Sequence, residues 1–227
     1  MRWLSAMKWL PFDKTLLCTL LFFDLLLLVF SNVGAREVDP ERSVLVQFKS
    51  SVSDPGGILS GWSSDGAGHH CSWFGVLCDM NYRVVGLNVS GGRGGGGVER
   101  LWMEFREIGG KLSPLIGKLS GLRVLSMPFN GFTGEIPVEI LGLKSLQVID
   151  LEGNLITGIL PVGIGELRGL RVLNLGFNRI FGEIPGSLSK CVELEVLNLA
   201  GNQLNGSIPA FIGSFSKLRG LYLSLNH

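Results

Sequence analysis

Apolar residues recur in the pattern L-x-x-L-x-L along the C-terminal half of the chain, and the whole pattern returns every 24 residues. One asparagine follows each copy of the pattern, and the five are Asn130, Asn154, Asn178, Asn202 and Asn226. Prolines keep the same step, at Pro137, Pro161, Pro185 and Pro209. A fixed period of this kind predicts one small structural unit per repeat, and neighbouring units must stack to bury their apolar side chains.

Within each unit the pattern predicts a short strand followed by turns. L-x-x-L-x-L-x-x-N with a period of roughly 20 to 29 residues is the signature of a leucine-rich-repeat solenoid. We therefore predict an α/β solenoid with short parallel strands at 98–227, built from five full units and a sixth that begins at Leu218 and stops at His227. The first unit, 98–121, is degenerate because Arg106 stands at the asparagine position. Since the sixth unit has no repeat or cap after it, we expect the sequence to be a fragment.

The asparagines and a G-x-I-P motif have physical roles in such a unit. The turn after each strand buries backbone amides and carbonyls, and an asparagine side chain can satisfy both. We therefore expect a ladder of stacked asparagines. Full units also carry G-x-I-P or a close variant, as at 134–137. Glycine permits the turn, and proline fixes the next backbone angle.

Strand residues between the inward leucines point away from the core, on the concave side of the solenoid. Aromatic side chains flanked by hydrogen-bonding groups suit contact with a peptide or protein. The candidate binding residues are Ser126, Phe129, Asp150, Glu152, Asn174, Phe177, Asn198 and Tyr222. A concave face must also carry side chains that are merely solvated, so both interpretations stay open.

The first 35 residues differ in composition from the rest of the chain. Basic residues precede an apolar run from Thr15 to Phe30, and small residues follow at 33–35. This order predicts a secretory signal peptide at 1–35. The alternative is an uncleaved membrane anchor, which Asp24 in the middle of the run disfavours.

Residues 36–83 predict an N-terminal cap for the solenoid, which requires one because its first repeat has no neighbour. Pro40 suits the first position of a short helix, whose apolar face includes Leu45. In a secreted protein, Cys71 and Cys78 favour a disulfide that staples this cap.

The segment 84–97 predicts a first strand at 84–89 and then an insertion with the sequence GGRGGGG. The glycines formally match the dinucleotide motif G-x-G-x-x-G. The residues after them already keep the 24-residue register, with Leu101 and Met103 at strand positions. We therefore interpret the glycines as a flexible insertion and expect no dinucleotide.

Charge and histidine placement exclude several functions. With 20 Lys and Arg against 19 Asp and Glu, the net charge of +1 is too balanced for nucleic-acid binding. His69 and His70 beside the two cysteines could be offered as a zinc set, but adjacent histidines cannot easily point at one metal. His227 is the only other histidine and lies outside the regular repeats, so a Ser-His-Asp site is not predicted. We expect no catalytic residue, metal or cofactor.

Two features concern modification and reactivity. Asn88 and Asn205 each begin an N-x-S glycosylation triplet. Asn205 falls on a turn, whereas Asn88 falls in a strand and is expected to be poorly accessible. Cys191 takes an inward position that is apolar in the sister repeats, and we interpret it as a buried free thiol.

The segment LRVLSMPFNGFTGEIP at 122–137 resembles the plant-specific class of leucine-rich repeats. The spacing Cys71-x-Trp73-x-Gly75-Val76-x-Cys78 resembles the N-terminal cap of plant receptor-like kinases. The strings IDLEGN at 149–154 and LNLGFN at 173–178 look closest to the Toadstool-type receptor-like kinases.

The resemblance implies the extracellular module of a cell-surface receptor, which binds a peptide or protein ligand or another receptor ectodomain. It places the chain outside the cell, secreted or at the plasma membrane. Membrane attachment is expected only through the N-terminal signal or a part outside this sequence. No H-R-D or D-F-G text is present, so no kinase activity is expected of these residues. The alternative is a secreted leucine-rich-repeat inhibitor of an extracellular enzyme, similar to polygalacturonase inhibitors.

Overall fold

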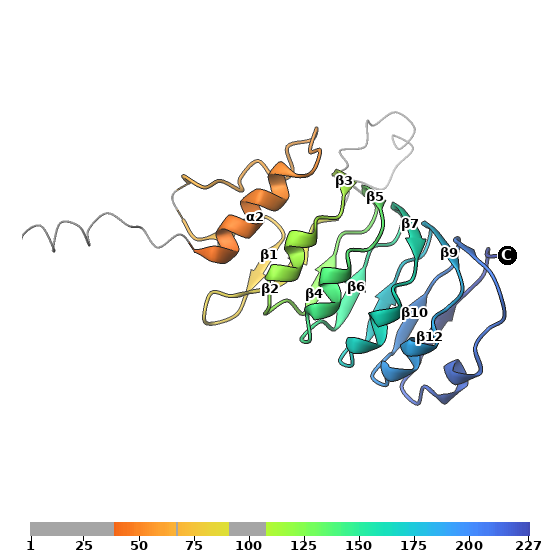
Figure 1. The fold of residues 1–227 in the computed structure, drawn as a ribbon. Coiled ribbons are helices and arrows are strands. Elements are labelled where there is room, and N and C mark those ends of the chain that lie inside the picture. The colour runs from red at the N-terminus through yellow and green to blue at the C-terminus, as the bar shows by residue number, and fades with distance from the viewer. Residues whose placement is uncertain (1–38, 67, 91–107) are drawn as a thin grey trace, which may run out of the picture. The chain divides into compact units, whose positions relative to one another are not determined.

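The computed structural model describes residues 39–66, 68–90 and 108–227 (Figure 1). The predicted signal peptide, the glycine-rich run and the strand positions at 98–107 lie outside the described residues. The elements below belong to Pro40–His227, which forms one compact unit. In the described ranges no helix is both long and apolar enough to cross a lipid bilayer.

The cap begins with helix α2, Pro40–Ser50, which starts at the predicted proline. Its buried face includes Phe48, whose ring lies 6.2 Å from that of Trp62 and 6.4 Å from that of Phe132, a residue of the repeats. The helix therefore covers the start of the solenoid, as expected of a cap. The 3-10 helix η1, His70–Ser72, follows in the cap. The predicted disulfide between Cys71 and Cys78 is confirmed.

The larger sheet has seven strands in the order β1-β2-β4-β6-β8-β10-β12. Their bounds are Val76–Cys78, Val84–Asn88, Val124–Ser126, Val148–Asp150, Val172–Asn174, Val196–Asn198 and Gly220–Tyr222. β1 pairs with β2 antiparallel, and every later pair is parallel. From β4 onward the partners lie 24 residues apart, as Leu125 and Ile149 do. The repeat period is therefore the register of the sheet.

A second sheet of five short parallel strands lies on the opposite side of each unit, in the order β11-β9-β7-β5-β3. In chain order, β3, β5, β7, β9 and β11 are Gly109–Lys111, Gly131–Gly134, Leu155–Ile159, Arg179–Gly182 and Gln203–Leu204. A 3-10 helix then completes each unit. In chain order, η3 to η7 are Pro114–Lys118, Val138–Gly142, Val162–Glu166, Gly186–Lys190 and Ala210–Ser214. Figure 1 shows these short helices following one another along the solenoid.

The asparagine ladder is confirmed. Asn154 Nδ2 donates to the carbonyl oxygens of Met127 and Leu151, each at 3.0 Å, and Asn154 Oδ1 accepts from the amide of Phe132 at 3.0 Å. Asn178 and Asn202 repeat the same contacts one unit further on. Each asparagine thus satisfies backbone groups of its own repeat and of the repeat before it, which ties neighbouring units together.

The unit before β4 differs from our expectation. We predicted a unit at 98–121 with Leu101 and Met103 in its strand, but the strand that pairs with β4 is β2, which sets Leu87 beside Leu125. The first strand predicted at 84–89 is therefore confirmed as β2, and it forms the rung beside β4. From Ile108 onward the predicted register is correct, because the amide of Ile108 donates to Asn130 Oδ1 at 3.1 Å, the ladder contact of the later units.

Cys191 is a buried free thiol, as predicted. Its Sγ lies 3.5 Å from the carbonyl oxygens of Ile164 and Leu167. Burial raises the pKa of the thiol to about 11, so it stays protonated near neutral pH. A protonated, enclosed thiol is not a nucleophile.

Candidate ligand-binding face

The outward side chains of the larger sheet form one row across five strands. In-register pairing sets Ser126, Asp150, Asn174, Asn198 and Tyr222 side by side, from β4 to β12. All five were predicted from the alternation within the repeat. They are half-buried or exposed, whereas the central residues of β4 to β10, Leu125, Ile149, Leu173 and Leu197, are buried in the core. The row is therefore the accessible part of the concave face.

Hydrogen bonds hold the polar side chains of this row in place. Asn174 Nδ2 donates to Glu152 Oε2 at 3.1 Å, a bond between neighbouring repeats. Asn174 Oδ1 and Asn198 Oδ1 each accept a backbone amide two residues later, at 3.3 and 3.1 Å. Asp150 Oδ1 accepts the amide of Glu152 in the same way, at 3.4 Å. Such local bonds reduce the rotamer freedom that a partner would otherwise have to immobilise.

Asp150 and Glu152 give this face a local negative charge. Burial raises the pKa of the Asp150 carboxyl, and repulsion from Glu152 adds to the effect, while hydrogen bonds from Glu152, Ser126 and Asn174 oppose it. Within the described residues neither carboxylate takes part in an ion pair. A basic group on a partner would therefore meet two carboxylates that no cation of the described chain neutralises.

Two phenylalanines stand at the edge of the row with unusual backbone angles. Phe129 and Phe177 have φ values of 55° and 54°, in the left-handed region. Each ring lies against a glycine of the next repeat. A Cβ added to Gly153 would come within 2.6 Å of Phe129 Cδ1, and one added to Gly201 within 2.7 Å of Phe177 Cδ1. The glycines thus make room for the rings, and Phe177 remains 52% exposed above its glycine.

The structure adds residues to this face that the sequence reasoning missed. Asn88 extends the row, because β2 sets it opposite Ser126. It is exposed, so the expectation that a strand position makes it poorly accessible is wrong: the strand faces outward at this residue. Arg171 and Glu195 directly precede β8 and β10. Their side chains form an ion pair, with Arg171 Nη1 3.9 Å from Glu195 Oε1, at the edge of this face. The register of the repeats could have revealed both features.

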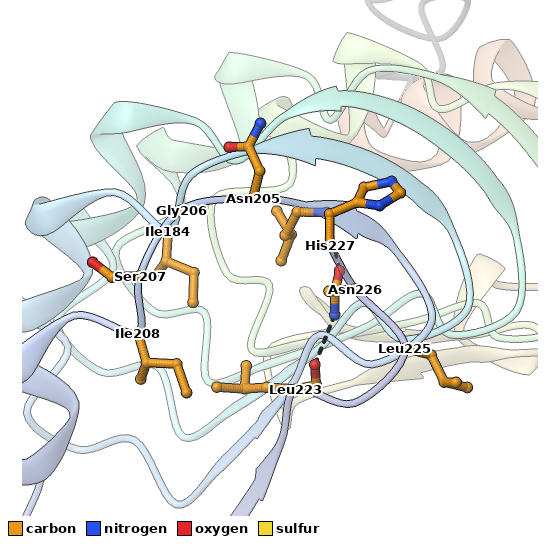
Figure 2. A pocket seen from close by; sticks show the side chains of 10 residues that line it. Ile184, Asn205, Gly206, Ser207, Ile208, Leu223, Leu225, Asn226 and His227 are labelled. Carbon is orange, nitrogen blue, oxygen red and sulfur yellow. Dashed lines mark hydrogen bonds between the residues drawn. The ribbon is translucent and has the colours of Figure 1, made fainter.

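A separate pocket of about 240 Å³ lies at the last described repeat (Figure 2). It is lined by Ile184, Leu204, Asn205, Gly206, Ser207, Ile208, Leu223, Leu225, Asn226 and His227. Asn205 is exposed at its rim, as a glycosylation site requires. None of the eight predicted concave-face residues lines this pocket. The pocket is thus separate from the candidate site.

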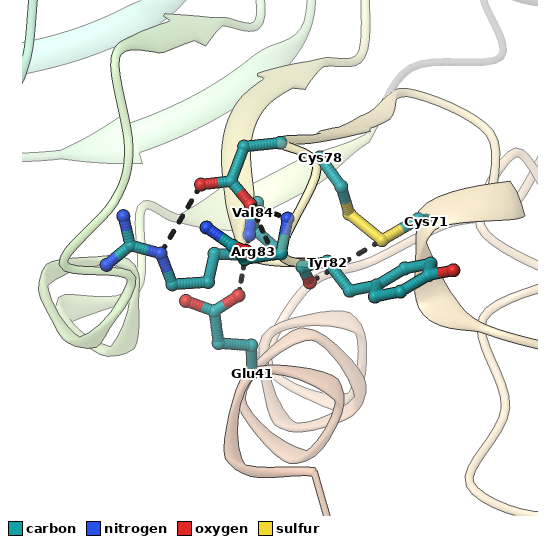
Figure 3. Close-up of polar contacts among 8 residues, drawn as sticks. Glu41, Cys71, Cys78, Tyr82, Arg83 and Val84 are labelled. Atoms are coloured by element: carbon teal, nitrogen blue, oxygen red, sulfur yellow. Dashed lines mark hydrogen bonds and ion pairs between the residues drawn. A yellow bond between two sulfur atoms is a disulfide. The ribbon is translucent and has the colours of Figure 1, made fainter.

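The disulfide lies where the cap meets the first strand (Figure 3). Glu41 of α2 accepts the backbone amide of Val84 at 2.6 Å, which joins the helix to β2. The ligand atoms of His69, His70, Cys71 and Cys78 lie within 4.8 Å of one another. Because the disulfide uses both sulfurs, only the two imidazoles of this group retain ligand atoms.

Family models match most of the described elements. The model described as "Leucine rich repeat N-terminal domain" matches residues 38–79, and two "Leucine rich repeat" models match 120–180 and 193–215. Among curated proteins, the chain is 41% identical over 152 residues to a probable leucine-rich-repeat receptor-like kinase, RPK1 of Arabidopsis thaliana. The chain is a leucine-rich-repeat protein, and it is similar to the plant leucine-rich-repeat receptor-kinase ectodomains.

The leucine-rich-repeat chain spans only part of these relatives. The match to RPK1 covers 62% of the chain but 28% of RPK1. A second relative, MALE DISCOVERER 1 of Arabidopsis thaliana, is 32% identical over 61% of the chain and 17% of its own length. The regions recognised by family models are the N-terminal domain and the repeats, which are not kinase sequence.

Solved structures share the leucine-rich-repeat fold. A chain in the BIR3–SERK2 complex of Arabidopsis thaliana superposes with a TM-score of 0.68 at 29% identity, over 82% of this chain and 93% of that one. The HAESA ectodomain of Arabidopsis thaliana, in complex with an N-terminally extended IDA peptide hormone, superposes with a TM-score of 0.71 at 30% identity. The match covers 85% of this chain and 30% of the HAESA chain. A plant ice-binding protein also superposes with a TM-score of 0.71 at 30% sequence identity, over 83% of this chain and 56% of that one.

Proposed function

We propose that this chain is the extracellular recognition module of a plant cell-surface receptor-like kinase, binding a peptide or protein ligand on its concave face. The proposal rests on the row from Ser126 to Tyr222, where hydrogen-bonded polar side chains lie beside the exposed ring of Phe177. Another receptor ectodomain is the second class of partner that we propose. The location is outside the cell, either secreted or at the plasma membrane.

The named relatives support this proposal. The HAESA structure holds a peptide hormone, and the BIR3–SERK2 structure holds two proteins in complex. Both resemble this chain over more than four-fifths of its length. Toadstool-type receptor-like kinases remain our proposal for the subgroup, on the strings IDLEGN and LNLGFN. A secreted inhibitor similar to polygalacturonase inhibitors would present the same face, and the receptor names among the relatives favour the first proposal.

The test is panning of the immobilised chain against a displayed library of random peptides. We expect enriched peptides whose binding weakens at least about tenfold in Phe177→Ala and in Glu152→Gln, because both side chains lie on the concave face. The matched control is Val138→Thr, which alters an exposed apolar residue of η4, away from this face.

Two results would count against the proposal. If no peptide is enriched, or if the concave-face variants bind as well as the control, the face is a solvated surface. Inhibition of a polygalacturonase by the chain, lost in the same variants, would instead support the inhibitor.

A further inference from the structure

Two adjacent outward positions on the smaller sheet depart from the pattern of the repeats. Ile159 occupies a position where the sister repeats carry Glu135, Glu183 and Ser207. Phe181 occupies one where they carry threonine or asparagine. Strand pairing sets Ile159 directly beside Phe181, on β7 and β9. The two side chains are 52% and 46% exposed, so an apolar pair stands where the same fold elsewhere presents polar residues.

Charges of opposite sign flank Phe181, one on β9 and one just after it. Arg179 lies two residues before Phe181 and Glu183 two residues after it, all on the outward face. Neither charged group has an ion pair among the described residues. Ile159, Arg179, Phe181 and Glu183 are called the lateral patch below. A positive and a negative side chain thus stand at equal sequence distances on either side of Phe181.

We propose that the lateral patch is an interface between two copies of this chain. A two-fold axis that crosses the strands at Phe181 reverses the strand direction in the second copy. It therefore sets Arg179 of each copy opposite Glu183 of the other, and it sets Phe181 and Ile159 against their own counterparts. An isologous contact requires such self-complementarity, which a patch of one charge sign would lack.

The proposed interface is small, and this sets its strength. Four side chains per copy fall below the area of standard stable interfaces, so the dimer is weak and concentration-dependent. Asn205 directly follows β11, which pairs with β9 and sets Leu204 beside Gly182, so Asn205 lies next to the lateral patch. A glycan on Asn205 would stand at the border of the patch, so the experiment uses the chain with Asn205→Gln.

The test is sedimentation velocity on the full chain, as purified from expressing plant cells, over a series of concentrations. We expect a reversible dimer. Phe181→Thr and Ile159→Glu install the residues of the sister repeats, which the fold already accommodates, and each should raise the dimer Kd at least about tenfold. Val138→Thr, at an exposed apolar residue of η4, should leave the Kd unchanged.

A charge exchange separates a second copy from any other partner. Arg179→Glu alone sets like charges opposite each other and should weaken the dimer. Adding Glu183→Arg restores both opposed pairs only if the two residues meet across a two-fold axis, so the double variant should dimerise within about threefold of the parent. A chain that stays monomeric, a dimer indifferent to Phe181→Thr, or a double variant no better than Arg179→Glu would overturn the proposal.

Discussion

Asn154 carries two structural duties in one side chain. It is 4% exposed, and it satisfies carbonyl oxygens of two repeats and an amide of the earlier one. Asn154→Ala should lower the free energy of unfolding by about 1–3 kcal/mol. The shortened side chain would leave buried backbone amides and carbonyls without a hydrogen-bond partner. Urea denaturation measures the change. Asn174→Ala, on the half-buried concave row, should cost clearly less, and equal costs would refute the ladder's role.

A second residue-scale prediction concerns the pH dependence of stability. Folding raises the pKa of Asp150, so the folded state binds this proton more tightly than the unfolded state. Its contribution to stability is therefore full below the unfolded pKa and is lost as pH rises through the folded pKa. Asp150→Asn removes the loss. The melting temperature of the variant, relative to the parent, should rise from about pH 3 to about pH 7.

Glu193 supplies the matched control with the opposite sign. A hydrogen bond and ion pair from Lys217 lower the pKa of Glu193, so its contribution is present above the unfolded pKa and lost as pH falls. Glu193→Gln should therefore lose stability relative to the parent over the same rise in pH. The effect should be small because the group is solvated. Parallel pH profiles for both variants would contradict the assignment for Asp150.

The roles of individual residues could be predicted from the sequence where the repeat period sets them. They could not be predicted where contacts with a neighbouring repeat set them. The inward leucines and the asparagine ladder follow from a period that places the same chemistry at each step. The contacts of Phe129 with Gly153 and of Phe177 with Gly201 join residues 24 apart, and only the backbone geometry shows that one ring covers the next glycine. The sequence marked the phenylalanines as candidates without showing how they are held.

Among the elements, the strand of each repeat and the first strand at 84–89 were predictable, but the sequence did not show which strand lies beside β4. Leu101 and Met103 have the spacing of a strand, yet β2 provides the strand beside β4. Spacing alone could not decide between them, because Leu101 and Met103 keep the 24-residue step to Leu125 and Met127 whether or not their segment pairs with β4. β1 was missed for another reason. Three residues inside a cysteine-bounded segment show no alternation, and their pairing with β2 depends on the fold of the cap.

The cap yields an element-scale prediction. Reduction of the Cys71–Cys78 disulfide should expose the segment between η1 and β2 to proteases before the repeats are cut, because this segment has little regular structure of its own. Limited proteolysis with and without a dithiol, followed by mass spectrometry of the fragments, measures the order of cleavage. The variant with both cysteines changed to serine should behave as the reduced chain does. First cleavage within the repeats would contradict the stapling role.

The whole molecule is a stack in which each repeat is held by its neighbours, so stability should vary along it. Strands β6 and β8 have a paired strand on both sides, whereas β12 pairs only with β10 among the described strands. We predict that the amides of Leu151 and Leu175 exchange with solvent far more slowly than those of the last rung. Hydrogen-exchange mass spectrometry measures this gradient. Uniform protection from β4 to β12 would show a single cooperative unit instead.

The alternation of phenylalanine and glycine gives the concave face a spacing of its own. Rings occur at Phe129 and Phe177, while Gly153 and Gly201 stand at the intervening positions. Two rungs of a parallel sheet span about 9.6 Å, nearly the length of one three-residue turn of polyproline II, about 9.3 Å. A ligand in the polyproline II conformation, lying along the solenoid, would therefore bring every third side chain over a ring, and residues three apart would contact successive rings.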